Sequence, residues 1–249
     1  MGRVHRIGLL AALGALLLPG VLTAPASAAS PAHAAGATAV LSNETTRTTW
    51  TVADYSGVIR SSPSPHARAV ANLQFQTPDG FLQSYILLRQ RWTRSGSWIQ
   101  LRIPGRPNGR VGWVPRGLMD VYHHTKLEIV VDREAERLTV YRSGHAIFVA
   151  PVGTGKSSTP TPTGHFWITE SFGGFNDPVY GPYAFGTADY SVLSDWPGGG
   201  IVGLHGTNEP ALVPGHPSHG CIRMHNNDVL TLARLTGGAN AIGTPLLVR

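Results

Sequence analysis

The chain has 249 residues, of which 14% are charged and 42% apolar, with 30 Gly and 19 Pro. This length can form one large domain or two modest ones, each with its own core. So few charges and so many turn residues argue against long surface helices and favour short strands joined by turns. The formal net charge of +6 suits an anionic partner surface without implying nucleic acid. The one cysteine, Cys221, excludes an intramolecular disulfide and a multi-cysteine metal site.

The first 28 residues have the three-part pattern of a secretory signal peptide. Arg3 and Arg6 precede an apolar run over residues 7–18, and small residues over 26–28 predict cleavage after Ala28. The apolar run is shorter than the roughly 20 residues that a bilayer span needs, so we expect no stable membrane span. We therefore expect an exported protein, secreted or in the cell envelope, and no nucleic-acid partner.

Two further boundaries follow the signal peptide. Residues 29–48 are rich in Ala, Ser and Thr, which predicts a flexible linker. Residues 49–122 contain short apolar runs separated by Pro, Gly, Asn and Asp, which predicts a small β-barrel. The runs are Thr51–Val52, Gly57–Arg60, Ser84–Leu88, Trp98–Ile103 and Val111–Val114. The segment over 109–115 resembles the closing strands of bacterial SH3-like modules, so we expect an SH3-like β module here.

This module carries a set of arginines with no acidic residue between them. They are Arg89, Arg91, Arg94, Arg102, Arg106, Arg110 and Arg116. With Trp92, Trp98 and Trp113 interleaved, they could form a face that binds a glycan or an anionic polymer. The alternative, which we favour, is a solvated strand face over a core that contains the tryptophans, because the arginines also occur in turns.

A second β-rich block covers residues 123–249. Its apolar runs predict strands at Leu127–Val131, Arg137–Tyr141, His145–Val149, Phe166–Thr169 and Pro245–Val248. The Gly- and Pro-containing segment 153–164 predicts a stiff loop, because its prolines forbid the helix of a phosphate-binding loop. One helix is predicted over 227–235, with apolar residues on one face and Gly237 at its end. The fold class is therefore mainly β.

The residues around Cys221 suit thiol chemistry. A cysteine nucleophile needs a base, and the base needs a third group that sets its tautomer. His219 lies two residues before Cys221 and His205 sixteen before it, so either could be the base. Gly206 and Gly220 let the backbone approach a substrate closely.

Two other interpretations of this cluster were weighed. Cys221 could be a small buried apolar residue with surface histidines nearby. A zinc site could draw on nearby histidines and the thiol, but no carboxylate is obviously placed and no His pair has helical metal-site spacing. Its candidate ligands would be His205, His216, His219, Cys221 and His225. We expect neither a metal nor a cofactor.

These motifs resemble the L,D-transpeptidase (YkuD-like) catalytic domain. The resemblance rests on His205-Gly206-Thr207 and on the run from Ser218 to Met224, and Gly-containing motifs over 152–155, 161–164 and 198–200 extend it. It covers residues 126–249 and implies a β-sandwich-like domain with one helix after the nucleophile. Some members carry Asn where this chain has Arg223, so the substrate contact made there is expected to differ.

The resemblance implies a role for each residue. Cys221 would attack the carbonyl of the third residue of a peptidoglycan stem tetrapeptide and release D-alanine. His205 would be proton acceptor and donor, oriented by the Gly206 carbonyl, with His219 supporting the site. Ser218, Gly220 and Arg223 would contact the substrate. The side-chain amine of a second stem would resolve the thioester, and carbapenem-type inhibitors are expected to react with Cys221.

Three alternatives remain open from the sequence. Water could resolve the thioester, which would make the protein an L,D-carboxypeptidase. The protein could also be a non-catalytic cell-wall-binding protein. Aromatic residues before the site could line a groove or simply pack against the sheet. These aromatic residues are Phe172, Phe175, Tyr180, Tyr183, Phe185, Tyr190 and Trp196.

Overall fold

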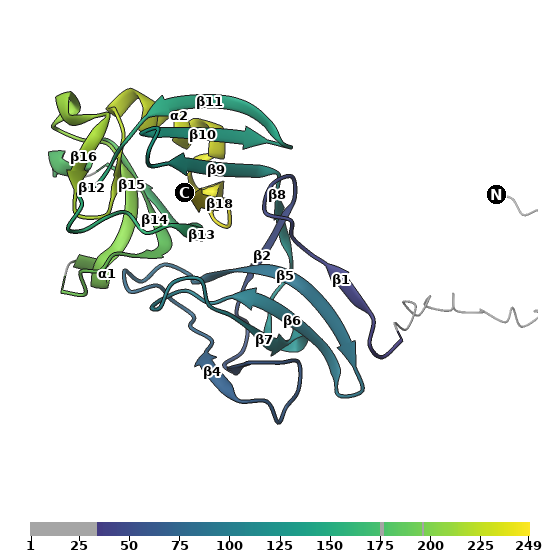
Figure 1. The fold of residues 1–249 in the computed structure, drawn as a ribbon. Helices are drawn as coiled ribbons and strands as arrows, with labels where there is room; N and C mark the ends of the chain where they lie inside the picture. Colours follow the sequence, from purple (N-terminus) through teal and green to yellow (C-terminus); the bar gives the residue numbers. More distant parts are fainter. Residues whose placement is uncertain (1–33, 175–176, 196) are drawn as a thin grey trace, which may run out of the picture. The chain divides into compact units, whose positions relative to one another are not determined.

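A computed structural model describes residues 34–174, 177–195 and 197–249 (Figure 1). The expected signal peptide over 1–28, the first part of the expected linker, Phe175 and Trp196 lie outside the described residues. Within the described ranges, none of the helices has the length and apolar character needed to cross a membrane. The chain is mainly β, as predicted, and the described residues from 34 onward fall into one unit built on two sheets.

The N-terminal sheet has the strand order β4-β3-β7-β6-β5-β2-β8, and β1 pairs with β5 beside this path (Figure 1). Its strands are β1 Thr38–Val40, β2 Thr48–Val52, β3 Val58–Arg60, β4 Ala69–Asn72, β5 Ser84–Thr93, β6 Gly96–Arg102, β7 Val111–Pro115 and β8 His123–Thr125. A 3-10 turn at Arg116–Leu118 follows β7. The buried residues of this sheet include Ile59, Tyr85 and Ile99, which form a core of their own.

Both ends of this module differ from the predicted boundaries. The expected linker over 29–48 contains β1, which pairs antiparallel with β5, and the Ser42 hydroxyl donates to the Leu87 carbonyl. An Ala- and Thr-rich composition resembles a linker, yet its backbone can still pair with a free strand edge. At the other end β8 pairs with β2, so the sheet continues past residue 122.

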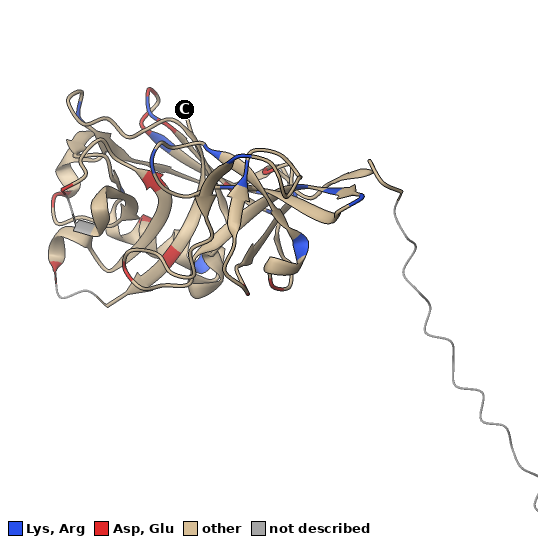
Figure 2. Cartoon of the chain, turned by 90° about the horizontal axis from the view of Figure 1, so that it is seen from below, with Lys and Arg blue, Asp and Glu red and all other residues tan. Residues whose placement is uncertain are grey.

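The arginines of this module do not form one binding face. Arg102 makes a bidentate ion pair with Glu44, whereas Arg110 and Arg116 donate to backbone carbonyls. Arg89 and Arg91 are exposed on β5, and Figure 2 shows Lys and Arg spread over separate strands and loops. Trp98 and Trp113 are buried and Trp92 is half-buried. The contacts of Arg102, Arg110 and Arg116 fit the structural interpretation better than a continuous polymer-binding surface.

The second sheet has the order β11-β10-β9-β18-β13-β14-β15-β17-β12-β16 (Figure 1). Its strands are β9 Leu127–Asp132, β10 Arg137–Arg142, β11 His145–Pro151, β12 Gly153–Gly155, β13 Gly164–Gly173, β14 Tyr183–Tyr190, β15 Ile201–His205, β16 Gly215–Ser218, β17 Ile222–Arg223 and β18 Pro245–Val248. β13 joins its two halves, because its first residues pair with β18 and its later ones with β14.

The helix predicted over 227–235 corresponds to α2, Asn226–Thr236, which buries Val229 and Leu232 against the sheet. Gly237 ends the helix in the left-handed conformation (φ 79°), which glycine adopts without strain. A short turn, α1 Pro197–Gly200, and 3-10 turns at 178–180, 210–212 and 238–241 complete the elements. The segment 153–155, predicted as part of a loop, is strand β12, paired with β16 and β17.

The two sheets share an apolar contact and a polar one. Trp167 of β13 packs with Ile86 of β5, and its indole N–H donates to Ser84. Beside it, the Asn108 amide donates to one carboxyl oxygen of Asp189 at 2.8 Å, whereas the other oxygen is buried without a partner. Burial raises the pKa of Asp189 to about 8, so this carboxyl is neutral over much of the physiological range.

Asp189→Asn is expected to stabilise the protein at high pH. The folded state holds a proton that the unfolded state releases above its ordinary pKa near 4, so the free energy of unfolding falls as pH rises from about 4 to 8. Asparagine keeps the acceptor for Asn108 and never ionises. We expect a gain of about 5 kcal/mol at pH 8, or roughly 10–20 °C in Tm, and little change below pH 4. Thermal unfolding curves that shift equally at all pH values would contradict this.

Candidate active site

Strand pairing brings Cys221 beside β15. β15 and β17 run parallel, with Leu204 opposite Ile222 and His205 opposite Arg223. Cys221 immediately precedes β17 and therefore lies next to Gly203, whose N–H donates to its sulfur at 3.4 Å. The pairing of β15 and β17 therefore places the thiol beside the strand that ends in His205.

Gly203 leaves an open space between the thiol and the imidazole. A Cβ at position 203 would lie 3.7 Å from His205 Cδ2 and 4.0 Å from Cys221 Sγ. Both functional side chains therefore border the position where any other residue would place a side chain. No local sequence pattern marks Gly203, because its position beside the thiol depends on the pairing of β15 with β17.

His205 is held as a neutral base. Its side chain is buried, and Nδ1 lies 2.6 Å from the Gly206 carbonyl oxygen. A carbonyl can only accept, so Nδ1 carries the proton and Nε2 is left as the basic nitrogen. Burial, opposed by the Gly206 contact and assisted by the positive charge of Arg223, lowers the pKa of His205 to about 4. The imidazole is therefore uncharged at neutral pH.

The thiol of Cys221 is also uncharged at rest. Burial raises its pKa above the ordinary value, opposed by the Gly203 N–H and by the charge of Arg223. A neutral thiol beside a neutral imidazole transfers its proton as it attacks, rather than resting as an ion pair. The positive guanidinium of Arg223 favours the thiolate that forms.

The loop before Cys221 is braced by several hydroxyl groups. The Ser218 hydroxyl donates to the Cys221 carbonyl at 2.6 Å and accepts from the Gly220 N–H at 3.1 Å. Thr161 donates to the Gly220 carbonyl, and Ser191 donates to the His219 carbonyl. The predicted substrate residues Ser218 and Gly220 are thus engaged in shaping this loop. The Gly220 N–H already donates to Ser218, so it is not free to bind a ligand.

The loop also changes where His219 lies. Residues 219 and 220 form a bend, with Gly220 at φ 131°, so His219 and Cys221 do not lie on one continuous strand. Its Nε2 accepts from Lys156 Nζ at 3.0 Å. His219 borders a small hollow that Cys221 and Arg223 also line, so it stays near the thiol.

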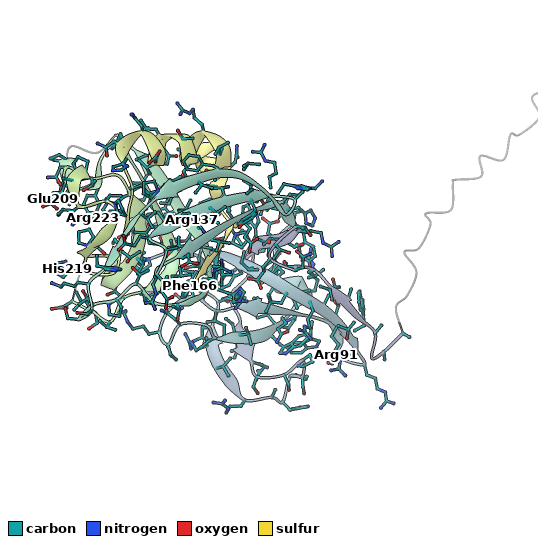
Figure 3. All side chains as sticks on the ribbon, turned by 45° about the horizontal axis from the view of Figure 1, so that its top comes forward. Arg91, Arg137, Phe166, Glu209, His219 and Arg223 are labelled. Atoms are coloured by element: carbon teal, nitrogen blue, oxygen red, sulfur yellow. The ribbon has the colours of Figure 1, made fainter. Side chains whose placement is uncertain are left out.

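Arg223 forms an ion pair that the sequence argument did not predict. Its guanidinium lies 2.7 Å from a carboxylate oxygen of Glu209, and only 14% of the Arg223 side chain is exposed. Figure 3 shows Glu209, Arg223 and His219 on the same side of the catalytic domain. The guanidinium therefore has a fixed partner while its charge acts on both Cys221 and His205.

Cys221 and His205 open into a cavity of about 220 Å³. Three of the aromatic residues singled out in the sequence line this cavity, namely Phe172, Tyr180 and Phe185. The Tyr180 ring meets the His205 ring edge-on, with 5.1 Å between the ring centroids. The remaining lining residues are Asp79, Glu170, Ala184, Gly186, Gly198, Ile201 and Gly203. The groove interpretation therefore holds for these three aromatics, whereas Tyr190 packs under the Arg106 guanidinium.

Among the described residues, no group of three or more His, Cys, Asp or Glu has the arrangement of a metal site. Two of the candidate zinc ligands, His216 and His225, contact other residues. His216 contacts Thr154 and Glu136, and His225 contacts Pro210 and Asp228. These contacts give His216 and His225 partners other than Cys221, and they do not support a shared metal site at the thiol.

Arg106 of the N-terminal sheet holds the loop that braces Cys221. Its guanidinium donates to the carbonyls of Ser191, Leu193 and Gly199, and Ser191 in turn donates to the His219 carbonyl. Asp79 and Arg106 both belong to the N-terminal module. No local sequence motif around either residue indicates that it lies near Cys221. Only the contact between the two sheets identifies them.

Arg106→Ala is expected to lower kcat about tenfold. The loss of these charge-assisted hydrogen bonds frees the backbone that supports Ser191, each such bond contributing about 1.5–3 kcal/mol. Steady-state kinetics well below the Tm of the variant would measure the change. Arg110→Ala is the matched control, since Arg110 also donates to carbonyls but only within the N-terminal sheet. Equal kcat losses in both variants would indicate a purely structural effect.

Comparison with known proteins identifies the family of the second β-rich block. The L,D-transpeptidase catalytic domain (YkuD) profile matches residues 126–248. A Bacillus subtilis protein named as L,D-transpeptidase YkuD is 34% identical over 119 residues, which are 48% of this chain and 65% of the relative. Another from Bacillus subtilis, named as L,D-transpeptidase YqjB, is 31% identical over 129 residues, which are 48% of this chain and 69% of the relative.

The chain matches only part of the length of these relatives. The chain spans 65% and 58% of the length of two of the curated relatives that it matches. Among solved structures, an L,D-transpeptidase from Enterococcus faecium is 25% identical over 49% of each chain, with a TM-score of 0.37. The profile match and the curated relatives are sufficient for the family. This chain belongs to the L,D-transpeptidase catalytic-domain family.

Proposed function

We propose that this chain is a secreted peptidoglycan L,D-transpeptidase that uses Cys221 as its nucleophile. The observation that carries the proposal is the placement of a neutral thiol and a neutral, correctly protonated imidazole at one cavity. Gly206 orients His205, and Arg223 favours the developing thiolate. Family membership supports the same chemistry.

The first half-reaction forms a thioester. Nε2 of His205 takes the thiol proton while the sulfur attacks the carbonyl carbon of the third stem residue, and the Cys221 N–H donates to the oxyanion. The C–N bond to D-alanine then breaks, and the imidazolium returns its proton to the departing amine. Cys221 is left acylated and His205 is neutral again.

The second half-reaction restores the thiol. The side-chain amine of a second stem attacks the thioester carbonyl and loses a proton to His205. The C–S bond breaks, an amide cross-link forms, and the thiolate recovers its proton from the imidazolium. His219, beside Lys156, supports the thiol side of the site. Attack by water instead of the amine would release a tripeptide stem.

Product analysis on a defined muropeptide tests this function. The protein is incubated with a purified disaccharide tetrapeptide, and the products are separated and weighed by mass spectrometry. D-alanine release with a cross-linked dimer is the expected result. D-alanine release with tripeptide alone would assign a carboxypeptidase, and an unchanged substrate would favour a non-catalytic wall-binding protein.

Inhibitor labelling gives a second measurement. Because Cys221 is the one cysteine of the chain, a carbapenem adduct should add one inhibitor mass to the intact protein and map to the peptide that contains residue 221. The absence of an adduct on folded protein would contradict the proposed nucleophile.

The remaining proposals concern export and the N-terminal module. Export predicts that the protein recovered outside the cell begins at Ala29, which N-terminal mass analysis would detect. We keep an SH3-like, wall-binding role for the N-terminal module as a prediction. Arg89 and Arg91, exposed on β5, are the residues available for it. Arg89→Ala with Arg91→Ala should weaken sedimentation with purified cell walls if this face binds them.

A further inference from the structure

A row of four residues crosses the catalytic sheet from β13 to the thiol. Glu170 of β13 lies opposite Gly186 of β14, and Gly186 lies opposite Gly203 of β15. Residues directly opposite one another share a face of the sheet. Gly203 is followed across the sheet by Cys221. Glu170 and Cys221 therefore border one cavity, whose floor between them is formed by two glycines.

The Glu170 carboxyl is directed along this floor. A Cβ at Gly186 would lie 2.5 Å from Glu170 Oε2, so the carboxyl occupies the space that a side chain at 186 would fill. Glu170 is 1% exposed, and its Oε1 is buried with no hydrogen-bond partner. A buried carboxyl oxygen without a donor is costly, and a ligand that supplies a donor would remove that cost.

A second carboxyl comes from the N-terminal module. Asp79, in the turn after Thr77, lines the same cavity, and the turn is held by stacking of Phe81 on Phe172 at 5.4 Å. Gly198 also leaves room for the Asp79 carboxyl, since a Cβ at position 198 would lie 3.3 Å from Asp79 Oδ2. Burial raises the pKa of Glu170, a hydrogen bond with Thr77 lowers it, and both the charge of Asp79 and a hydrogen bond with Asp79 raise it further. Two such carboxyls favour a cation between them.

We propose that Glu170 and Asp79 form a subsite for a primary ammonium group, that of the side chain of the donor stem's third residue. This inference rests on the proposed function, in which the side-chain amine of one stem's third residue attacks the thioester of another. Stems of the same kind serve as donor and acceptor, so the donor carries the same amine. That amine needs a place in the cavity while Cys221 attacks the neighbouring carbonyl.

The distance between the Glu170 carboxyl and Cys221 Sγ favours binding of the donor stem's amine over that of the acceptor stem. Cβ positions on adjacent strands are about 5 Å apart, so the Glu170 carboxyl lies within about 12 Å of Cys221 Sγ. The extended side chain of a diamino acid covers much of this span. The acceptor amine must instead lie about 3 Å from the thioester carbon to react, well away from the carboxyl pair. The acidic pair therefore acts in donor binding.

Single-turnover acylation of Cys221 tests the subsite without an acceptor. Two tetrapeptide donors are compared, one with the free side-chain amine and one with that amine acetylated, and the acyl-enzyme and D-alanine are followed by mass spectrometry. Wild-type protein should acylate at least tenfold more efficiently with the free amine. In Glu170→Gln this preference should fall close to one, through loss of efficiency on the amine donor alone.

Controls separate failure of this inference from failure of the proposed function. Glu134→Gln, an exposed change in the turn between β9 and β10, should keep the wild-type preference. A penem that has no ammonium group should label Cys221 in all variants. Asp79→Asn provides a second variant on the opposite side of the subsite and should reduce the preference severalfold.

The outcomes are distinct. If no donor and no penem acylates the wild-type protein, the proposed function fails. If the wild-type protein uses both donors equally, or if Glu170→Gln and Asp79→Asn both keep the full preference, the ammonium subsite is wrong while the transpeptidase function stands. Thermal unfolding of Glu170→Gln should show no loss of Tm, because the change removes a buried ionisable group.

Discussion

Cys221→Ala is expected to abolish D-alanine release, cross-link formation and carbapenem labelling. No other thiol exists in the chain, and Cys221 shares its cavity with His205. Removing the nucleophile leaves only the contribution of binding and oxyanion contacts, so the rate should fall by at least about 10⁴-fold. Muropeptide product analysis by mass spectrometry, at long incubation times, measures the residual activity.

The matched control for this loss is structural. The Cys221 sulfur accepts one weak hydrogen bond from Gly203 and is only half-buried, so its removal should change the free energy of unfolding by no more than about 1 kcal/mol. Cys221→Ser, which keeps the shape, should fold equally well and stay nearly inactive because a serine hydroxyl is harder to deprotonate. Cross-linking by Cys221→Ala at the wild-type rate would overturn the proposed mechanism.

His205→Gln is expected to lower kcat/KM by about 10²–10⁴-fold near neutral pH. Glutamine can occupy the buried site beside Gly206, but it cannot accept the thiol proton. Attack then depends on thiolate that has already formed. Because the pKa of Cys221 is raised by burial, that fraction is small at neutral pH and grows tenfold with each pH unit below the pKa.

The pH profile distinguishes a proton-transfer role from a packing role. In the wild-type protein the base is active once His205 is deprotonated, so activity should rise through about pH 4 and then level off. In His205→Gln this acidic limb should disappear, and activity should instead climb through the alkaline range. A variant that kept the wild-type profile at a lower rate would indicate that His205 serves packing alone. Penem labelling rates measured across the pH range would show either behaviour.

Local patterns in the sequence were sufficient to propose thiol chemistry at Cys221. The spacing of His205 and His219 to the thiol, and the glycines beside them, indicated a cysteine nucleophile with a histidine base. The alternation of apolar residues predicted most strands, and the apolar face before Gly237 predicted helix α2. These features depend on residues close in the chain, so a linear pattern retains them. Composition misled over residues 38–40, where a small, Thr-containing segment pairs as an edge strand.

Which groups complete the cavity was decided only by tertiary structure. Gly203, Gly186 and Glu170 form one row because β13, β14 and β15 pair in a particular register, and register is a long-range property. Asp79 and Arg106 reach the catalytic domain from the other sheet, about a hundred residues earlier in the chain. Thus the sequence by itself indicated the family, the proposed nucleophile and the two histidines that could serve as its base. The surroundings that set the protonation of Cys221 and His205 arise from burial and from contacts between distant segments, which no local pattern records.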